Sequence, residues 1–275
     1  MEQAYSRWLT HVTEPELLEQ LKNMSEQERQ EAFCCELAFG TGGLRGILGA
    51  GTNRMNVYTV RRATQGLANY LKKQKLPLSA AIAHDSRRCG RAFAEAAACV
   101  LAANGVKVYL YPRLEPTPAL SWAVRYFSCG AGICIRASHN PAQYNGYKVY
   151  GPDGCQITLD AANAMEQEIA GIDYFMDVQT CGDQEARADG RIESIPDSVL
   201  DAYVDAVYAQ RVTDADCSVH PARNQSSSSI WKSMKTIRSG QNEPMPRCGQ
   251  PVRSFCNSKI WPAALAAGQS AYSVQ

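Results

Sequence analysis

The chain has 275 residues, of which 45% are apolar and 20% are charged, and its formal net charge is +1. This length and apolar content suffice for one large domain or two ordinary ones, each with a buried core. No stretch approaches the roughly 18 uninterrupted apolar residues of a membrane helix, so we do not expect a membrane-inserted protein. The N-terminus has neither the basic start nor the apolar core of a signal peptide, so we do not expect a secreted protein.

Eleven cysteines are present, including the adjacent pair Cys34 and Cys35, but no C-x-x-C spacing occurs. Cys99 and Cys134 lie in apolar runs, where a free thiol packs as a small hydrophobic group. A disulfide framework is not expected in a chain of this length without a signal peptide. The cysteine usage therefore indicates a reducing cytoplasm.

The expected elements alternate between helices and short apolar strands. Residues 1–38 are predicted to be helical, with a capping box at Ser25-Glu-Gln-Glu28, and the glycine-rich residues 39–51 to form a loop. Further helices are expected at 57–73, 91–103 and 118–127, strands at 78–83, 107–111 and 131–135, and a hairpin at 147–157. This order predicts an α/β fold in which helices sandwich a mostly parallel sheet.

The C-terminal part of the chain differs in composition from the rest. A last helix is expected from a cap at Ser198-Val-Leu-Asp201 to about Arg211. Residues 218–275 contain seven Lys or Arg and one acid, whereas residues 1–217 contain 21 basic and 26 acidic residues. The tail has no helical or strand periodicity, so we hypothesise that it is non-native sequence from a reading-frame shift near codon 218. The alternative is a genuine but disordered basic tail, and resequencing around that codon distinguishes the two.

One segment carries most of the chemical information. The apolar run 131–135 predicts a buried strand that leads to Ser138, His139 and an Asn-Pro turn signal, and Lys148 follows seven residues after Pro141. A phosphorylated serine brings about −1.5 to −2 charges and three acceptor oxygens, which need nearby donors and cations. Ser138 is therefore a candidate phosphoryl carrier, and its alternative is a serine that only caps a turn. Lysine titrates near 10.4, so acid–base work by Lys148 requires desolvation or neighbouring cations.

Two further segments are candidates for phosphate binding and loop support. Arg45 follows Gly42 and Gly43; glycines allow backbone N–H groups to approach an anion, and the planar guanidinium suits phosphate oxygens. The alternative is an ordinary flexible loop, since no nucleotide-binding fingerprint is present. Asp85 and Arg87 follow a predicted strand, where α/β sheets place their sites. They could hold the serine loop or form a purely structural ion pair.

These segments together resemble a known family. Ala137-Ser-His-Asn-Pro141 with Asn145-Gly-Tyr-Lys148 looks like the active-site loop of the phosphoglucomutase/phosphomannomutase family, the α-D-phosphohexomutases. Phe39-Gly-Thr-Gly-Gly-Leu-Arg-Gly46 and His84-Asp-Ser-Arg87 resemble two further motifs of that family, in the same order. The resemblance covers roughly residues 1–217, and it implies that the α/β part of the chain has the fold of the family's domain I.

The resemblance also implies an activity and a set of site residues. The family interconverts hexose 1-phosphates and 6-phosphates in the cytoplasm through a phosphoserine and a bisphosphorylated sugar, with Mg²⁺ and a sugar bisphosphate activator. The expected partners are hexose phosphates, with neither nucleic acid nor membrane. The residues implied in catalysis are Ser138, His139, Lys148 and Arg45, those implied in phosphate or loop support are Gly42, Gly43, Asp85, Arg87 and Asn140, and the implied metal ligand is the phosphoserine oxygen of Ser138.

The chain departs from the family pattern in two respects. Arg136 stands where the family usually has Thr, and an added cation there could stabilise the phosphoserine or distort its loop. We find none of three loops that the later domains of the family carry: the Asp-Gly-Asp-x-Asp metal loop, the sugar-specificity loop and the phosphate-gripping loop. The string most similar to the metal loop is Asp189-Gly-Arg191. We therefore expect a helical segment at 1–38, domain I with the phosphoserine loop at 39–180, the start of domain II at 181–217, and an irregular basic tail at 218–275.

On this organisation the chain is expected to be a truncated phosphohexomutase, inactive alone. One alternative is a non-catalytic binding or regulatory module that keeps the domain I fold. Another is a serine hydrolase that uses Ser138 and His139, although adjacent residues rarely present a nucleophile and its base face to face, and no G-x-S-x-G elbow is present.

Overall fold

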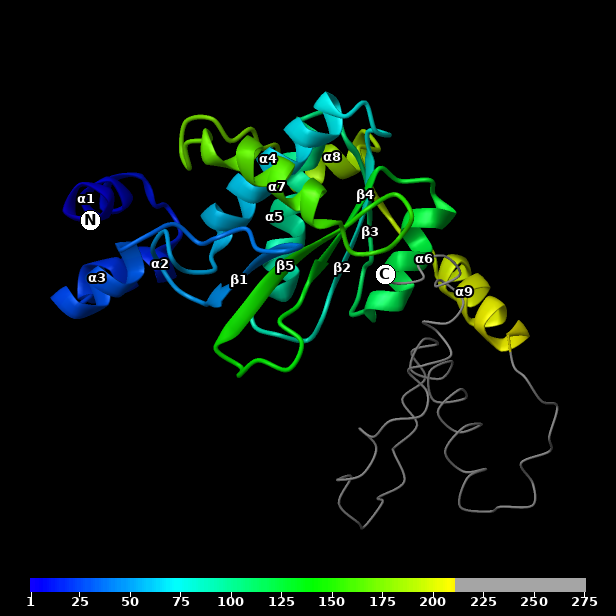
Figure 1. Ribbon diagram of the computed structural model, residues 1–275, viewed down its shortest axis with the longest axis horizontal. Coiled ribbons are helices and arrows are strands. Elements are labelled where there is room, and N and C mark those ends of the chain that lie inside the picture. The colour runs from blue at the N-terminus through cyan, green and yellow to red at the C-terminus, as the bar shows by residue number, and fades with distance from the viewer. Residues whose placement is uncertain (211–275) are drawn as a thin grey trace, which may run out of the picture. The chain divides into compact units, whose positions relative to one another are not determined.

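The computed structural model describes residues 1–210 (Figure 1). The hypotheses about the tail at 218–275, and the expected helix end at Arg211, lie outside these residues. Among the residues described, no helix is long and apolar enough to cross a membrane.

Helices and strands alternate through most of the described chain. The helices are α1 (Glu2–His11), α2 (Pro15–Asn23), α3 (Glu26–Phe33), α4 (Val57–Lys73), α5 (Gly90–Ala103), α6 (Thr117–Tyr126), α7 (Leu159–Ala170), α8 (Asp183–Ala188) and α9 (Asp197–Ala209). The strands are β1 (Gly43–Ile47), β2 (Ser79–His84), β3 (Lys107–Leu110), β4 (Ala131–Ile135), β5 (Tyr144–Tyr150) and β6 (Ile192–Ser194). The expected helix at 57–73 and strand at 131–135 are confirmed with the same bounds.

The strands form one mixed sheet in the order β1-β5-β4-β2-β3-β6. β5 is antiparallel to both β1 and β4, and the other neighbouring pairs are parallel. The expectation of a mostly parallel α/β sheet is therefore confirmed. Because β2 and β4 are parallel neighbours, with His84 opposite Ile135, the loops that follow them leave from the same edge of the sheet.

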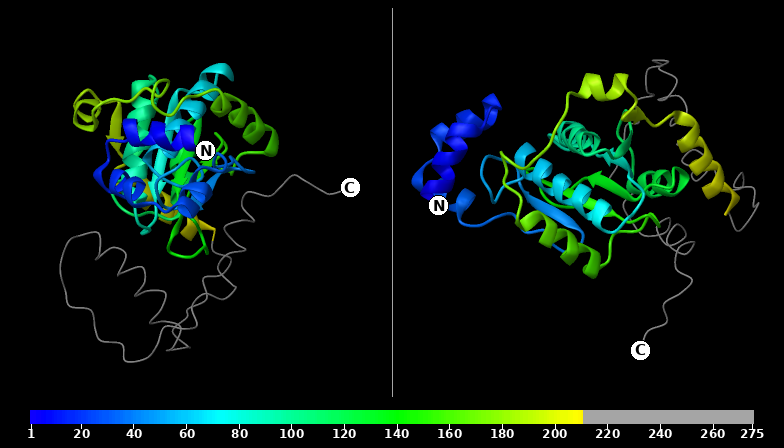
Figure 2. Two further views of the ribbon diagram at one scale, coloured as in Figure 1. Left: turned by 90° about the vertical axis from the view of Figure 1, so that its left-hand side faces the viewer. Right: turned by 90° about the horizontal axis from the view of Figure 1, so that it is seen from above.

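Alternating side chains of the strands pack into two cores, one on each face of the sheet. Ala80 and Ile82 of β2 belong to the core shared with α4, α5, α7 and α8, whereas Ala81 and Ala83 belong to the core shared with α6 and the start of α9. This alternation follows from the two-residue repeat of a strand. Helices consequently flank the sheet on both sides (Figure 2).

The N-terminal helices pack around a third, aromatic core. Trp8 is buried and makes edge-on ring contacts, with centroids 5.5–5.7 Å away, to Phe33, Tyr58, Tyr174 and Phe175. Aromatic pairs of this geometry add to the stabilisation that comes from buried area alone. The core thus joins α1 and α3 to α4 and to the chain after α7, although these segments lie far apart in the sequence.

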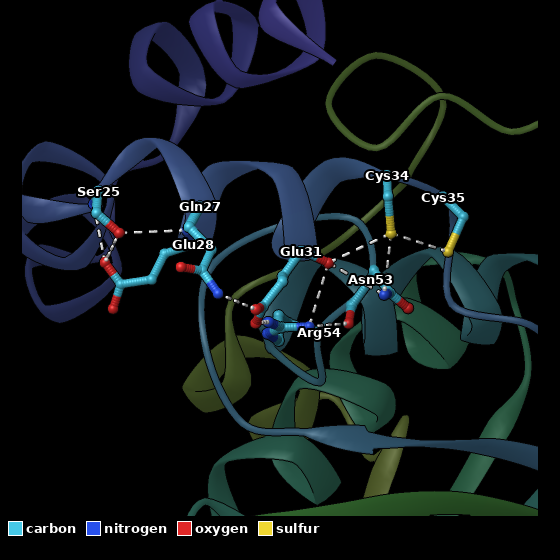
Figure 3. Close-up of polar contacts among 8 residues, drawn as sticks. All are labelled: Ser25, Gln27, Glu28, Glu31, Cys34, Cys35, Asn53 and Arg54. Atoms are coloured by element: carbon cyan, nitrogen blue, oxygen red, sulfur yellow. Dashed lines mark hydrogen bonds and ion pairs between the residues drawn. The ribbon is translucent and has the colours of Figure 1, made fainter.

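Side-chain hydrogen bonds hold both ends of helix α3 (Figure 3). The capping box predicted at Ser25 is confirmed, because Ser25 Oγ accepts a hydrogen bond from the Glu28 amide while the Glu28 carboxylate accepts one from the Ser25 amide. At the other end, Asn53 Nδ2 and Arg54 Nη1 donate to the carbonyl oxygen of Glu31 at 3.1 and 3.3 Å. Side-chain donors thus satisfy a carbonyl that the end of the helix leaves free.

Two expected elements differ in the structure. The segment 39–51, expected to be a loop because of its glycines, contains strand β1. A side chain at Gly43 would collide with the backbone of Tyr147 in β5, so pairing between strands, rather than flexibility, requires glycine there. In place of the expected hairpin at 147–157, β5 begins at Tyr144 and pairs with β1 and β4, and the chain beyond Gly151 returns only as a single bridge between Tyr150 and Gln156.

The C-terminal part of the described chain continues the same sheet. α8 packs on α5, and β6 pairs in parallel with β3, with Val108 opposite Ile192. Met1–Tyr203 form one compact unit. The expected start of domain II at residue 181 stays a prediction. Helix α9 begins at Asp197, which places Ser198 in the first turn rather than at the expected cap.

Asn56 is the buried cap of α4, and its removal is expected to destabilise the fold more than loss of an exposed cap. Its Oδ1 accepts from the amides of Tyr58 and Thr59, and its Nδ2 donates to the carbonyls of Gly49 and Gly51. Asn56→Ala is expected to lower the free energy of unfolding by about 2–3 kcal/mol, because it removes the cap and leaves buried carbonyls unsatisfied.

Urea unfolding of the two capping variants measures this difference. Ser25→Ala, in the exposed capping box of α3, serves as the control and is expected to cost about 1 kcal/mol or less. An equal decrease in the free energy of unfolding in the two variants would contradict the role given to the buried amide of Asn56.

Candidate active site

Two loops meet where β2 and β4 end. β2 leads into residues 85–88, β4 leads into residues 136–143, and the Asp85 amide donates to the Ile135 carbonyl at 3.1 Å. Parallel pairing of the two strands therefore brings Asp85 and Arg87 beside the serine loop, as the sequence analysis expected of residues at carboxyl strand ends.

Ser138 lies at the tip of a tight turn. The Asn140 amide donates to the Ala137 carbonyl at 3.1 Å, and Ser138 has a φ of 55°, in the left-handed region that few serines adopt. Its side chain is exposed, and its Oγ lies 3.5 Å from Nδ1 of the neighbouring His139. That distance is at the outer limit of hydrogen bonding. The strained backbone is typical of residues that a surrounding structure holds for function.

Arg87 holds this turn with both terminal nitrogens of its guanidinium group. Nη1 donates to the carbonyls of Pro141 and Tyr144 at 2.8 and 3.0 Å, and Nη2 donates to those of Ser138 and Asn140 at 2.9 and 2.6 Å. The planar fork of arginine suits four converging acceptors, a pattern that a lysine ammonium does not match. The serine loop is therefore fixed through its backbone, which leaves the Ser138 hydroxyl exposed.

Asp85 holds Arg87 in turn. Its Oδ1 accepts from the Arg87 amide at 3.0 Å, and its Oδ2 lies 3.7 Å from Arg87 Nε. The pair that the sequence analysis suggested thus connects the loop after β2 to the loop after β4.

Asn145 makes a second connection that the sequence analysis did not assign to the site. It is fully buried, its Nδ2 donates to the Arg88 carbonyl at 2.9 Å, and its Oδ1 accepts from the Gly146 amide at 2.8 Å. Gly146 is required next to it, because a side chain there would press on the carbonyls of Arg136 and Leu44. The motif Asn145-Gly-Tyr-Lys148 could have pointed to Asn145 as a site residue, but the sequence analysis used it only to recognise the family resemblance.

Lys148 lies on β5, with Arg45 on the neighbouring strand β1 and Arg136 directly after β4. In the antiparallel pairs, Lys148 is opposite Gly43 of β1 and Cys134 of β4, and Arg45 is opposite Gly146. Burial, followed by the charges of Arg45 and Arg136, lowers the pKa of Lys148 below the usual value of a lysine. This is the environment that the sequence analysis required for acid–base work by Lys148.

The glycines before Arg45 act through packing. The amides of Gly42 and Gly43 both lie against the Gly40 carbonyl, and the Gly42 carbonyl accepts from the Val149 amide at 2.9 Å. A side chain at Gly42 would meet Gln156, and one at Gly43 would meet Tyr147. Gly43 therefore lets β1 lie close against β5 and so positions Arg45, whose side chain is exposed.

The described residues do not complete a site for a metal. Within residues 1–210, no group of three or more His, Cys, Asp and Glu side chains could hold a metal ion. A phosphorylated Ser138 would offer one oxygen ligand, whereas Mg²⁺ favours a near-octahedral set of oxygens.

A variant at Arg87 is expected to loosen the serine loop. In Arg87→Lys the charge near Asp85 remains, but one ammonium cannot reach four carbonyls in the same geometry. Amide hydrogen exchange at residues 138–144 is expected to speed up at least tenfold, while exchange in β2 and β4 changes little. Arg88→Lys, at the exposed neighbouring position, is the control. Unchanged protection of the loop in Arg87→Lys would show that the guanidinium does not hold it.

The pKa of Lys148 predicts a pH dependence with a defined sign. The pKa of Lys148 is lower in the folded chain than the usual value of about 10.4. The unfolded chain therefore binds the proton more tightly than the folded chain does. The contribution of Lys148 to the free energy of unfolding consequently rises as the pH rises from the folded pKa to the unfolded pKa. Arg45→Gln removes a repelling charge and is expected to raise the pKa of Lys148, as measured by NMR titration of its Cε group. Titration of wild-type Lys148 at the ordinary value would contradict the geometry, and Arg88→Gln is the control.

Comparisons with known proteins agree with this geometry. Residues 36–175 match the family model for phosphoglucomutase/phosphomannomutase, alpha/beta/alpha domain I. The chain is 39% identical over 179 residues to a phosphoglucomutase of Staphylococcus haemolyticus, covering 65% of this chain and 32% of the relative. It is 35% identical over 198 residues to a phosphoglucomutase of Staphylococcus epidermidis, covering 72% of this chain and 36% of the relative. It thus spans about a third of the length of these relatives.

A solved structure supports the same assignment. A crystal structure from Thermus thermophilus, described as a phosphomannomutase, superposes with a TM-score of 0.54 at 28% identity, covering 64% of this chain and 36% of that chain. The family model, the relatives and the superposition confirm the resemblance noted in the sequence. The chain belongs to the phosphoglucomutase/phosphomannomutase family, and its sheet with flanking helices is the family's α/β/α domain I.

Proposed function

We propose that Ser138 carries a phosphoryl group and that this chain is the phosphoserine-bearing part of an enzyme that interconverts hexose 1-phosphates and 6-phosphates. The observation that carries the proposal is the strained turn at Ser138, which Arg87 holds through four carbonyls while the hydroxyl stays exposed. Ser128 also has a left-handed backbone, so the feature that distinguishes Ser138 is the set of four hydrogen bonds by which Arg87 holds its turn.

The cations around the loop suit the charge that the reaction develops. A phosphoserine adds about −1.5 to −2 charges at neutral pH, and Arg45 and Lys148 lie on adjacent strands beside the loop. In the forward transfer the bond between phosphorus and Ser138 Oγ breaks, and a bond forms between phosphorus and a sugar hydroxyl oxygen. Lys148, whose pKa is lowered, accepts the hydroxyl proton and returns a proton to Ser138 Oγ. The other phosphoryl group of the bisphosphorylated sugar then re-phosphorylates the serine.

His139 is proposed to balance phosphate charge rather than to activate the serine. Its Nδ1 is 3.5 Å from Ser138 Oγ, at the limit of a hydrogen bond. A serine hydrolase needs a nucleophile and a base in closer contact, with the base oriented by a third group. The geometry therefore favours phosphoryl transfer over the hydrolase alternative.

The complete reaction is proposed for a longer protein than the described residues. Phosphoryl transfer uses a divalent cation to neutralise charge in the transition state, and residues 1–210 contain no cluster of side chains that would hold one. Mg²⁺ and a sugar bisphosphate activator are accordingly proposed for the enzyme whose further domains complete the site. We likewise propose that the substrate is a hexose phosphate and that the enzyme is cytoplasmic, and the support for both is the similarity to relatives named phosphoglucomutase.

Mass spectrometry after incubation with glucose 1,6-bisphosphate tests the phosphoryl carrier. Phosphate is expected on Ser138 in the wild-type chain and on no serine in Ser138→Ala. Ser128 is the matched control, because it too has a left-handed backbone, with a φ of 51°, but precedes β4 instead of following it. Ser128→Ala is expected to be phosphorylated like the wild type.

The same samples test the activity of the chain alone. Conversion of glucose 1-phosphate is expected to be negligible against the roughly 1–10³ s⁻¹ typical of enzymes. Phosphate on another residue, or an unmodified Ser138 in the presence of a metal and the bisphosphate, would overturn the proposed role.

A further inference from the structure

Two adjacent free thiols meet at the C-terminal end of α3. Cys34 and Cys35 directly follow this helix, and both are exposed. Their Sγ atoms lie 3.6 Å apart, in the contact drawn in Figure 3. The cysteine pair noted in the sequence is therefore a pair of neighbouring sulfur atoms in the structure, open to a reagent from solution.

Neighbouring groups fix the position of both residues. Cys34 Sγ donates to the Glu31 carbonyl at 3.4 Å and accepts from Asn53 Nδ2 at 3.5 Å. The Cys35 carbonyl accepts from Thr52 Oγ1 at 2.7 Å. The sulfur of one cysteine and the backbone of the other are thus held by the loop before α4. A site held in this way before a ligand arrives loses little conformational freedom on binding.

The spacing of the pair suits one bridging atom better than a disulfide. A disulfide places its sulfurs about 2.05 Å apart and usually its Cα atoms about 4.4–6.8 Å apart. Adjacent residues joined by a trans peptide have Cα atoms only about 3.8 Å apart, so closing a disulfide would strain the chain. A single atom bonded to both sulfurs at about 2.3 Å would subtend an angle of about 100° across the observed separation of 3.6 Å. The thiols therefore already have the spacing that a two-point attachment needs.

The described residues also restrict which atom could occupy this position. Zn²⁺ in proteins takes four ligands, and the part of the chain that the structure describes has no group of three or more His, Cys, Asp and Glu side chains that could hold a metal. The hydrogen bond with Cys34, followed by burial, raises the pKa of Cys35, which favours a neutral thiol over the thiolate that a metal ion requires. A trivalent arsenic atom with one organic group needs only two more bonds, favours sulfur, has a pyramidal geometry and reacts with neutral thiols.

We propose that Cys34 and Cys35 form a dithiol site that binds a trivalent arsenical carrying one organic group. In the reaction two arsenic–oxygen bonds break and two arsenic–sulfur bonds form. The two thiol protons leave with the two oxygens as two water molecules, and nothing is oxidised or reduced. The site lies outside the serine loop, and the inference uses no part of the proposed function.

Phenylarsine oxide tests the site in the full chain, because in water its arsenic carries two exchangeable oxygens. Native mass spectrometry is expected to show one phenylarsenic group per chain, with two hydrogens lost from the protein. Alkylation by iodoacetamide is expected to be blocked at Cys34 and Cys35 in the complex. Cys89 and Cys155, which are exposed as well, are expected to be alkylated as in the free protein.

Serine variants show whether both sulfurs are needed. Cys34→Ser and Cys35→Ser are each expected to weaken binding about a hundredfold or more, because the remaining thiol forms one bond and loses the advantage of an intramolecular second bond. Serine at position 34 retains a hydroxyl donor for the Glu31 carbonyl, so α3 is expected to keep its structure. Cys155→Ser, at an exposed cysteine, is the matched control and is expected to leave the affinity within about twofold of the wild type.

A second control addresses another two cysteines that lie near each other. Cys181 Sγ donates to the Cys99 carbonyl at 3.3 Å, and both residues are half-buried. Burial raises the pKa of Cys99 to about 11. Cys99→Ser is expected to leave the affinity for phenylarsine oxide unchanged.

The outcomes that would overturn the site follow from its geometry. Wild-type affinity in Cys34→Ser or Cys35→Ser, or loss of binding in Cys99→Ser, would place the arsenic elsewhere. One arsenic atom joining two chains, seen as a dimer in the mass spectrum, would show that the two sulfurs of one chain do not bind it together. Alkylation of Cys34 and Cys35 in the wild-type complex would refute the site without reference to any variant.

Discussion

The grip of Arg87 on the serine turn is the interaction on which the rest of the site depends. A serine with a left-handed backbone on an exposed loop would relax if nothing opposed the strain. Four hydrogen bonds from one guanidinium oppose it, and Asp85 accepts a hydrogen bond from the Arg87 amide and forms an ion pair with the guanidinium at 3.7 Å. All of these contacts require the loops after β2 and β4 to leave one edge of the sheet together, which follows from the parallel pairing of the two strands.

The sheet also determines the electrostatics of the site. β5 runs antiparallel between β1 and β4, and this arrangement places Lys148 between Arg45 of β1 and Arg136, the residue that follows β4. Close approach of β1 to β5 depends on glycine at position 43, where a side chain would collide with the Tyr147 backbone. Arg45 and Arg136 both repel the charge of Lys148, and proteins accept such strain where a ligand or a reaction uses it.

Much of the secondary structure could be predicted from local patterns. α4 and β4 have the predicted bounds because each has a clear signal: helical spacing in one and a short apolar run in the other. β1 was missed because its glycines resemble those of a loop, and only contact with β5 explains them. β6 was missed because a strand of three residues is too short to show a periodic pattern. α8 was missed because a helix of six residues is also too short to show one. The motif around Ser138 located the site and included Asn145, but the hydrogen bonds of the buried Asn145 amide have no local signal, because one of them joins residues 57 positions apart.

By itself the sequence determined the family, the α/β class, the order of most elements, and the serine, lysine and arginine side chains on which the proposed chemistry rests. These properties depend on residue type and on spacing along the chain, which a sequence states directly. Only the tertiary structure decided that Arg87 holds the turn through carbonyl oxygens, that residues up to Tyr203 join one compact unit, and that Arg45 and Lys148 come together on paired strands. These depend on distances between residues far apart in the chain, and such distances arise only when strands pair and loops meet in three dimensions.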